Sequence, residues 1–136
     1  MIDPRFAAYT EHILEGFAEY CGLELQELSQ EKCIVSVRLR PEHMNLYGFV
    51  HGGMIDTLMD NTGGILAAFI HGEYRTVVTG CSDAFFLNPI RGERMYAVAT
   101  PVKAGRTMTR TQLSVYDGDD RLCTVGYLEY VYTDHR

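Results

Sequence analysis

Residues 45–60 read NLYGFVHGGMIDTLMD and join a polar loop to a long apolar segment. Gly52 and Gly53 end the loop, and the apolar residues that follow predict a helix over about residues 53–71. Because apolar side chains would cover most of the circumference of this helix, it cannot lie on the surface. The rest of the chain must therefore wrap around it on several sides.

Strand-like patterns stand on both sides of this helix. Before it, residues 33–39 alternate apolar and polar side chains, which predicts a strand buried on one face, and residues 23–28 are expected to pair with it. After it come four strand-like runs, near residues 76–88, 94–103, 107–117 and 121–132. The connections are too short for crossover helices, so we expect an α+β fold in which an antiparallel sheet wraps around one long central helix.

The first residues predict a further helix. Asp3 and Pro4 are the residue types of a helix cap and a first turn, and aromatic or aliphatic residues then recur at near-helical spacing until Gly22. We therefore expect an amphipathic N-terminal helix over about residues 4–21.

Length and charge limit the classes of function. A chain of 136 residues is expected to form a single domain over residues 1–136. The net charge of −6, with no run of Lys or Arg, argues against nucleic-acid binding. No segment has the ~18 consecutive apolar residues of a membrane span, and the N-terminus lacks the apolar region of a signal peptide. We therefore expect a cytoplasmic protein without a membrane partner.

The cysteines and histidines predict no metal site. The four cysteines form no Cys-x-x-Cys pair and stand in apolar surroundings, which favours buried free thiols. Four of the histidines show no mutual metal-ligand spacing: His12, His43, His71 and His135. We expect no metal ion and no cofactor beyond what a substrate carries.

Asp60 is a costly residue at its position. It lies two turns into the apolar helix, where no free helical N–H groups remain to stabilise it. A desolvated carboxylate needs a partner or a chemical use, and composition alone leaves a purely structural carboxylate open. Asp56 lies one turn earlier and is expected to fall in the first turn, where the helix dipole stabilises negative charge.

The glycine pair at the helix start has two interpretations. The first N–H groups of a helix have no partner within the helix, and glycine lets a ligand approach the backbone, so Gly52 and Gly53 could bind an oxyanion. They could equally serve a tight turn that requires glycine dihedral angles.

The joint spacing of these residues resembles the signature of the PaaI-like hotdog thioesterases, in which an Asn, then His-Gly-Gly, then a helical Asp occur in this order. The likeness continues through residues 76–89, which end in FFLNP, and through the turn KAGRT at residues 103–107. It covers about residues 32–132. It implies a hotdog fold and the hydrolysis of an acyl-CoA to a free acid and CoA.

The resemblance also implies roles for single residues. The backbone N–H of Gly52 would form the oxyanion hole, Asn45 would orient the thioester carbonyl, and Asp60 would be the catalytic carboxylate. A hydroxyl residue near the carboxylate falls on Thr79. His51 and Gly53 would lie beside the substrate, with His51 as a buried residue that braces the loop.

Substrate contacts are less well defined. The resemblance suggests that Lys103 and Arg106 contact the CoA phosphates, although solvated turn charges would look the same. The acyl group is expected to contact apolar residues close to the motif: Met44, Tyr47, Phe49 and Met54. They indicate a short, medium or aryl acyl group and no more.

The spacing of Gly52 and Asp60 requires two chains. The two residues are eight positions apart on one helix, or ~12 Å, which is too far for both to touch one carbonyl group. If two subunits meet with their central helices antiparallel, Gly52 of one helix can lie near Asp60 of the other. We therefore expect a homodimer, and the resemblance adds a dimer of dimers, or homotetramer, as a second option.

Two other functions stay open. A non-catalytic acyl-CoA-binding hotdog protein would keep the glycine turn without requiring Asp60. A hotdog dehydratase or hydratase would need His51 for proton transfer. For the thioesterase itself, Asp60 could activate water or attack the thioester directly.

Overall fold

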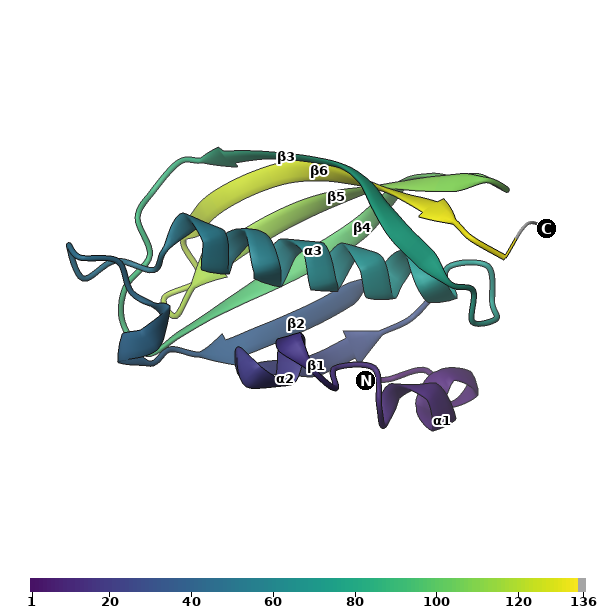
Figure 1. Ribbon diagram of the computed structural model, residues 1–136, viewed down its shortest axis with the longest axis horizontal. Coiled ribbons are helices and arrows are strands. Elements are labelled where there is room, and N and C mark those ends of the chain that lie inside the picture. Colours follow the sequence, from purple (N-terminus) through teal and green to yellow (C-terminus); the bar gives the residue numbers. More distant parts are fainter. Residues whose placement is uncertain (135–136) are drawn as a thin grey trace.

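The computed structural model describes residues 1–134 and has six strands around one long helix (Figure 1). The strands are β1 (Leu23–Leu28), β2 (Cys33–Arg38), β3 (Val77–Phe86), β4 (Arg94–Ala104), β5 (Met108–Asp117) and β6 (Leu122–Tyr132). They form one sheet in the order β1-β2-β4-β5-β6-β3, and all neighbouring strands are antiparallel. The predicted α+β fold is confirmed.

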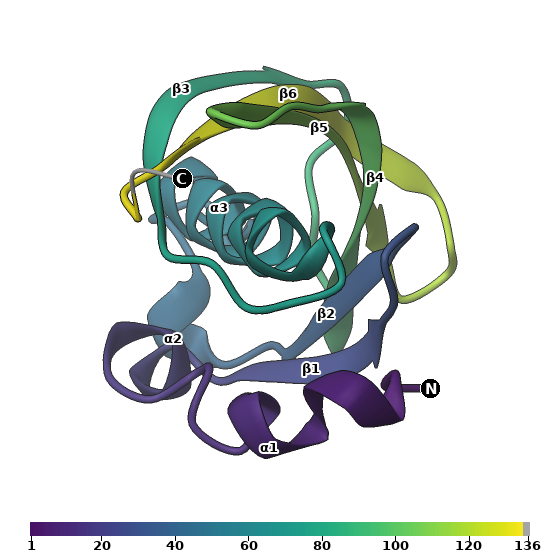
Figure 2. The same ribbon diagram turned by 90° about the vertical axis from the view of Figure 1, so that its right-hand side faces the viewer.

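The central helix α3 (Gly52–Phe69) lies inside the curl of the sheet (Figure 2). It contacts β2, β3, β4 and β5, as its apolar circumference predicted. Its largest fully buried side chains are Leu58, Met59, Leu66 and Phe69. Because burying each such side chain contributes ~1.5 to 3 kcal/mol, the helix is fixed firmly on the sheet, and so are the residues it carries.

The N-terminal segment, residues 1–22, is not the single helix that the sequence predicted. It contains a 3-10 helix and two single helical turns: η1 (Pro4–Phe6), α1 (Ala7–Thr10) and α2 (Phe17–Tyr20). Asp3 caps the first of these by accepting a hydrogen bond from the Arg5 amide, as expected. The helical path ends before α2, where Gly16 has a φ of 89°, which is a left-handed conformation.

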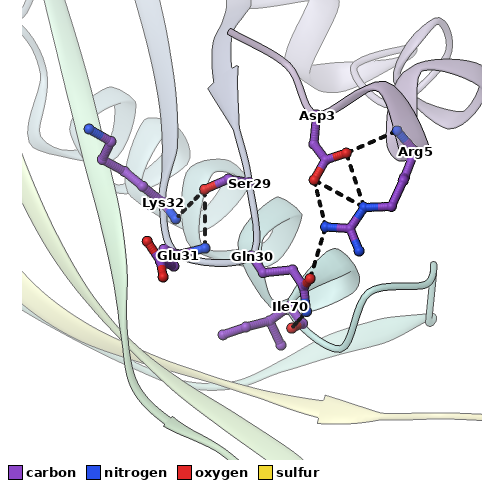
Figure 3. A network of polar contacts seen from close by, with 7 residues as sticks. All are labelled: Asp3, Arg5, Ser29, Gln30, Glu31, Lys32 and Ile70. Atoms are coloured by element: carbon purple, nitrogen blue, oxygen red, sulfur yellow. Dashed lines mark hydrogen bonds and ion pairs between the residues drawn. The ribbon is translucent and has the colours of Figure 1, made fainter.

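A series of polar contacts fastens the N-terminal segment to the C-terminal end of α3 (Figure 3). Arg5 pairs with Asp3 and donates to the side-chain oxygen of Gln30 at 2.9 Å. The side-chain nitrogen of Gln30 then donates to the carbonyl of Ile70, the C-cap residue of α3, also at 2.9 Å. The N-terminus, the β1–β2 turn and the end of α3 are thereby held together.

Strand β3 forms an edge of the sheet and is largely exposed. Val78, Phe85 and Phe86 on this strand are 54%, 54% and 50% exposed. An exposed edge with apolar side chains is a template for pairing with a second chain. Strand β3 therefore has the features of an edge strand that can pair with another chain.

Three further expectations concern single residue types and membrane spans. Cys21, Cys33 and Cys123 are buried free thiols as predicted, but Cys81 on β3 is exposed. No helix within residues 1–134 is long and apolar enough to cross a bilayer. In the same part of the chain, no three His, Cys, Asp or Glu side chains come together as metal ligands would. His135 lies outside the described residues.

Candidate active site

Asp60 and Thr79 lie in direct contact. The Thr79 hydroxyl on β3 donates a hydrogen bond of 2.7 Å to a carboxylate oxygen of Asp60, which is half-buried on α3. Strand pairing passes from Thr79 with Tyr130 to Cys81 with Glu129, so Gly80 is an extra residue in a β-bulge. Bulges often redirect a side chain beside an active site. The structure thus brings together the two residues that the sequence placed side by side.

Tyr130 is a residue of this site that the sequence did not indicate. Its hydroxyl donates a hydrogen bond of 2.8 Å to the backbone carbonyl of Asp60. Burial, with a smaller contribution from the charge of Asp60, raises the pKa of Tyr130 well above its usual range, so it stays a protonated donor. It holds the helical turn that carries the carboxylate.

Glycines in the middle of α3 make room for Tyr130. A Cβ atom at Gly63 would lie 2.5 Å from the Tyr130 hydroxyl oxygen and 2.9 Å from that of Thr111, and one at Gly64 would lie 3.3 Å from the Tyr130 ring. Two adjacent glycines inside a helix cost ~1 kcal/mol each relative to alanine. That cost is the one signal in the sequence that a large side chain packs against the helix here.

Two hydrogen-bond donors lie together near the start of α3. The backbone N–H of Gly52 has no acceptor within residues 1–134. The side-chain oxygen of Asn45 accepts from the amides of Tyr47 and Phe49, which leaves its NH₂ group without an acceptor among the described residues. Gly52 and Asn45 line the same cavity of about 300 Å³. Both donors are therefore available to a ligand bound in this cavity.

His51 is exposed, not buried as the sequence suggested, but it does brace the helix start. Its Nδ1 accepts a hydrogen bond of 2.9 Å from the N–H of Gly53, so Gly53 has no free amide to offer a substrate. With Nδ1 occupied as an acceptor, the neutral ring carries its proton on Nε2. This tautomer donates a proton at its outer nitrogen and cannot accept one there.

The two halves of the predicted site lie apart within one chain. Asn45 and Gly52 line one cavity, whereas Asp60 and Thr79 line a different cavity of about 350 Å³. This separation agrees with the ~12 Å expected between Gly52 and Asp60 along the helix. Within one protomer, the donors and the carboxylate do not face a common space.

Asp56 is not in the first turn of α3, because the helix begins at Gly52 and has no acidic residue there. It therefore gains little from the helix dipole, which acts within the first turn. Partial burial, and to a smaller extent the charge of Asp60, raise the pKa of Asp56. Asp56 is a destabilising charge near Asp60, opposite to the role predicted for it.

The basic residues predicted to bind phosphate line a cavity of their own. Lys103 and Arg106 lie on the wall of a space of about 590 Å³, together with Arg110 and Glu129. Arg110 is paired with Glu129, whereas Lys103 and Arg106 have no acidic partner within residues 1–134. The backbone carbonyl of Arg106 accepts a hydrogen bond of 3.1 Å from Arg75. The two uncompensated cations can hold an anion.

The residues expected to form the acyl pocket are dispersed. Phe49 lines the cavity that holds Asn45 and Gly52. Met54 is buried in the core, and Tyr47 is 75% exposed. None of the four expected residues, Met44 included, lines the cavity beside Asp60.

Comparison with known proteins identifies the family. A family model described as the thioesterase superfamily matches residues 47–124, more than half of the chain. This chain belongs to the thioesterase superfamily. The match includes the loop after Asn45, the whole of α3 and the strand that carries Thr79.

Two curated relatives of this thioesterase superfamily member carry provisional esterase names. One, from Deinococcus radiodurans, is 28% identical over 105 residues, which cover 77% of this chain and 70% of the relative. The other, from Haemophilus influenzae, is 26% identical over 109 residues, which cover 80% of this chain and 79% of the relative.

Solved structures share the fold. A thioesterase from Haemophilus influenzae superposes with a TM-score of 0.85 at 22% identity, over 96% of this chain and 94% of that one. A mutant of the phenylacetic acid degradation protein PaaI from Thermus thermophilus superposes with a TM-score of 0.76 at 22% identity, over 85% and 96% of the two chains. The hotdog fold and the resemblance to PaaI-like proteins are thereby confirmed.

Proposed function

We propose that this protein is a cytoplasmic acyl-CoA thioesterase that hydrolyses its substrate in a site shared by two subunits. The observation that carries the proposal is the Asp60–Thr79 pair on one side of α3, together with two unpaired donors, Gly52 N–H and Asn45 NH₂, at its start. Thioester hydrolysis needs a base or nucleophile and donors for the developing oxyanion. These groups supply both.

The chemistry follows from those groups. In the water route, Asp60 takes a proton from a water molecule oriented by Thr79, and the water oxygen bonds to the thioester carbon. Gly52 and Asn45 of the neighbouring chain stabilise the negative charge on the carbonyl oxygen. The tetrahedral intermediate collapses, the carbon–sulfur bond breaks, and the proton passes from Asp60 to the CoA sulfur. In the direct route, Asp60 attacks the carbon, the carbon–sulfur bond breaks, and CoA leaves as a thiolate. Water then hydrolyses the resulting anhydride to the free acid and the Asp60 carboxylate, and the proton it releases is taken up by the thiolate.

The edge strand β3 supports a second subunit at this site. Thr79 lies on β3, and the exposed backbone and apolar side chains of that strand can pair with β3 of another copy. A two-fold axis at this edge places the two α3 helices antiparallel and side by side. Gly52 of each helix then lies near Asp60 of the other, in two equivalent sites per homodimer.

Lys103 and Arg106 are proposed to bind the CoA phosphates. They lie in the β4–β5 hairpin and line a cavity without an acidic partner of their own. An acidic protein needs such local cations to hold an anionic ligand. No cofactor is required beyond the CoA that the substrate brings.

The alternative functions fit the site less well. A non-catalytic binder would not need a carboxylate that accepts a hydrogen bond from Thr79, on a helical turn whose backbone carbonyl is held by Tyr130. A dehydratase would need His51 as a base, but its Nδ1 is occupied by the Gly53 amide and its Nε2 carries the proton. The thioesterase uses every group that the site presents.

The first test measures free-thiol release from a panel of short, medium and aryl acyl-CoAs. Asp60→Asn is expected to lose most of kcat, while His51→Ala retains it, and both variants are expected to stay dimeric by sedimentation. Unchanged hydrolysis in Asp60→Asn would refute the proposed mechanism. Loss of thiol release in His51→Ala alone would transfer the assignment to the histidine.

The second test asks whether one site draws on two chains. Asn45→Asp keeps the oxygen that braces the loop but loses the NH₂ donor, and Asp60→Asn loses the carboxylate. After subunit exchange between these two inactive dimers, mixed dimers contain one intact site, so about a quarter of wild-type activity should return. A site built within one chain would give no recovery.

A further inference from the structure

The cavity beside Asp60 continues along α3 away from the carboxylate. Asp60 and Thr79 lie at one end of it, and Gly64 and Ala68 follow on the same side of the helix. Ile13, from the N-terminal segment, also lines the cavity. We call this space the α3 groove.

Aromatic residues pack together at the far end of the α3 groove. Tyr74, which lines the groove, stacks on Tyr9 with ring centroids 5.3 Å apart and also contacts Phe69, the last residue of α3. Phe69 in turn packs on Phe6 at 4.7 Å. These four residues, which we call the aromatic cluster, join the N-terminal segment to the end of α3.

The N-terminal wall is anchored and not a loose tail. The Asp3, Arg5 and Gln30 contacts of Figure 3 end on the carbonyl of Ile70, one residue beyond α3. The Asp3 amide also donates to the carbonyl of Leu28 on β1, at 2.8 Å. Ile13 itself is partly buried and packs against the core, so it forms part of the boundary of the groove.

The groove has a polar and an apolar end. Asp60, Asn61 and Thr79 lie at the reacting end. Ile65 and Ala68, each 5% exposed, and Ile13 supply apolar surface toward the other end. Arg75 is the one charged residue lining that end within residues 1–134, and its guanidinium is committed to Asp134 and to the ring of Tyr132.

The length of the groove sets the size of what fits. Asp60 and Ala68 are eight residues apart on α3, which corresponds to ~12 Å. The thioester carbon has to lie about 3 Å from the carboxylate oxygen, which leaves about 9 Å for the chain. An extended chain advances about 1.2 Å per bond, so about seven bonds, or eight carbons, fit in that length. The groove has a volume of about 350 Å³.

We propose that the α3 groove binds the acyl group of the substrate, that it takes an unbranched acyl chain of about eight carbons, and that Ile13 of the N-terminal segment limits the chain length. The inference rests on the proposed thioesterase function and adds the substrate class to it. A medium chain with its thioester at Asp60 reaches Ala68 and Ile13. Its methylene groups lie against the apolar wall.

The pantetheine arm of CoA is the competing occupant, and the groove suits it poorly. That arm carries two amide groups, which need hydrogen-bond partners when they are buried. In the inner half of the groove, the Arg75 guanidinium is already paired with Asp134 and the Thr76 hydroxyl with Thr133, so these side chains are not free to bind the amides.

The test compares kcat/KM for acetyl-, butyryl-, octanoyl- and dodecanoyl-CoA in the wild type and three variants. Ala68→Leu should lower kcat/KM for octanoyl-CoA at least about tenfold and leave acetyl-CoA unchanged, because each buried methylene contributes about fourfold. Ile13→Ala should raise the ratio of kcat/KM for dodecanoyl-CoA to kcat/KM for octanoyl-CoA about fivefold. Leu14→Ala is the matched control, since Leu14 is partly buried in the same loop but does not line the groove.

Each outcome separates the occupants. An equal loss for all four substrates in Ala68→Leu, with an unchanged melting temperature, would assign the groove to the pantetheine arm. A wild-type preference for acetyl-CoA, or an unchanged profile in both Ile13→Ala and Ala68→Leu, would also overturn the proposal.

A binding measurement keeps the inference separate from the proposed function. Octyl-CoA, a thioether that cannot be hydrolysed, should bind the wild type more tightly than ethyl-CoA by calorimetry, and Ala68→Leu should remove the difference. If the wild type hydrolyses nothing but binds octyl-CoA in this way, the thioesterase function is refuted, and the proposal that the α3 groove binds an acyl chain is supported. Equal binding of the two thioethers would refute the acyl-binding role of the α3 groove, whatever the activity.

Discussion

Replacing Thr79 by valine removes one hydroxyl group and leaves a side chain of nearly the same shape. That hydroxyl donates at 2.7 Å to a carboxylate oxygen of Asp60, so the variant loses a charge-assisted hydrogen bond. Hydrogen bonds to charged groups contribute ~1.5 to 3 kcal/mol. If this bond orients the carboxylate or the attacking water in the transition state, kcat should fall roughly ten- to a hundredfold.

The assay is steady-state thiol release with the best acyl-CoA of the panel. KM should change little, because valine keeps the shape of the side chain that lines the groove. Thr79→Ser should retain most of kcat because it keeps the hydroxyl. Thermal melting controls for folding, and valine suits a β-strand at least as well as threonine. A kcat for Thr79→Val within twofold of the wild type would refute the reasoning, as would an equal loss in Thr79→Ser.

Two further substitutions test the surroundings of the carboxylate. Gly63→Ala should destabilise the protein by about 1 to 3 kcal/mol in urea unfolding, because its Cβ atom would lie 2.5 Å from the Tyr130 hydroxyl oxygen. Gly64→Ala, with its nearest contact at 3.3 Å, should cost clearly less, and equal costs would contradict the packing argument. Asp56→Asn should stabilise the protein at pH 7.5, because the pKa of the Asp56 carboxyl is raised in the folded state. Such a carboxyl favours folding only at low pH, and this contribution is lost as pH rises through the folded pKa. The advantage of Asp56→Asn should shrink as pH falls toward 4, and an advantage that does not change with pH would show that the charge of Asp56 is not its cause.

The sheet and the central helix could be predicted because each has one dominant period. Alternation fixed the strands to within two residues of their observed ends, and the apolar circumference of α3 predicted its burial. The N-terminal helix was predicted wrongly for a physical reason. Phe6 packs on Phe69 of α3, but Phe17 and Tyr20 are 65% and 79% exposed, so these aromatic residues do not share one buried face.

The candidate site was predictable where it is local in sequence. The spacing of Gly52 and Asp60 along one helix predicted that they lie apart within one chain, and they line separate cavities. Tyr130 could not be predicted, because it lies 70 residues from Asp60 and reaches it only through the pairing of β6 with β3. The α3 groove could not be predicted for the same reason, since Ile13 and Ala68 line one space only when the N-terminal segment docks on α3.

Strand β3 cannot pair in the sheet until β6 has been synthesised. It is the third strand in sequence, yet within residues 1–134 it pairs in the sheet with the last strand alone, Leu122–Tyr132. As the chain leaves the ribosome, α3 and β3 are complete well before that partner exists, so the apolar faces of α3 that the later strands cover stay exposed in the meantime. Because such distant contacts form slowly, we expect a nascent chain that stops short of β6 to aggregate or to bind chaperones, and Asp60 to be the last part of the site to find its place.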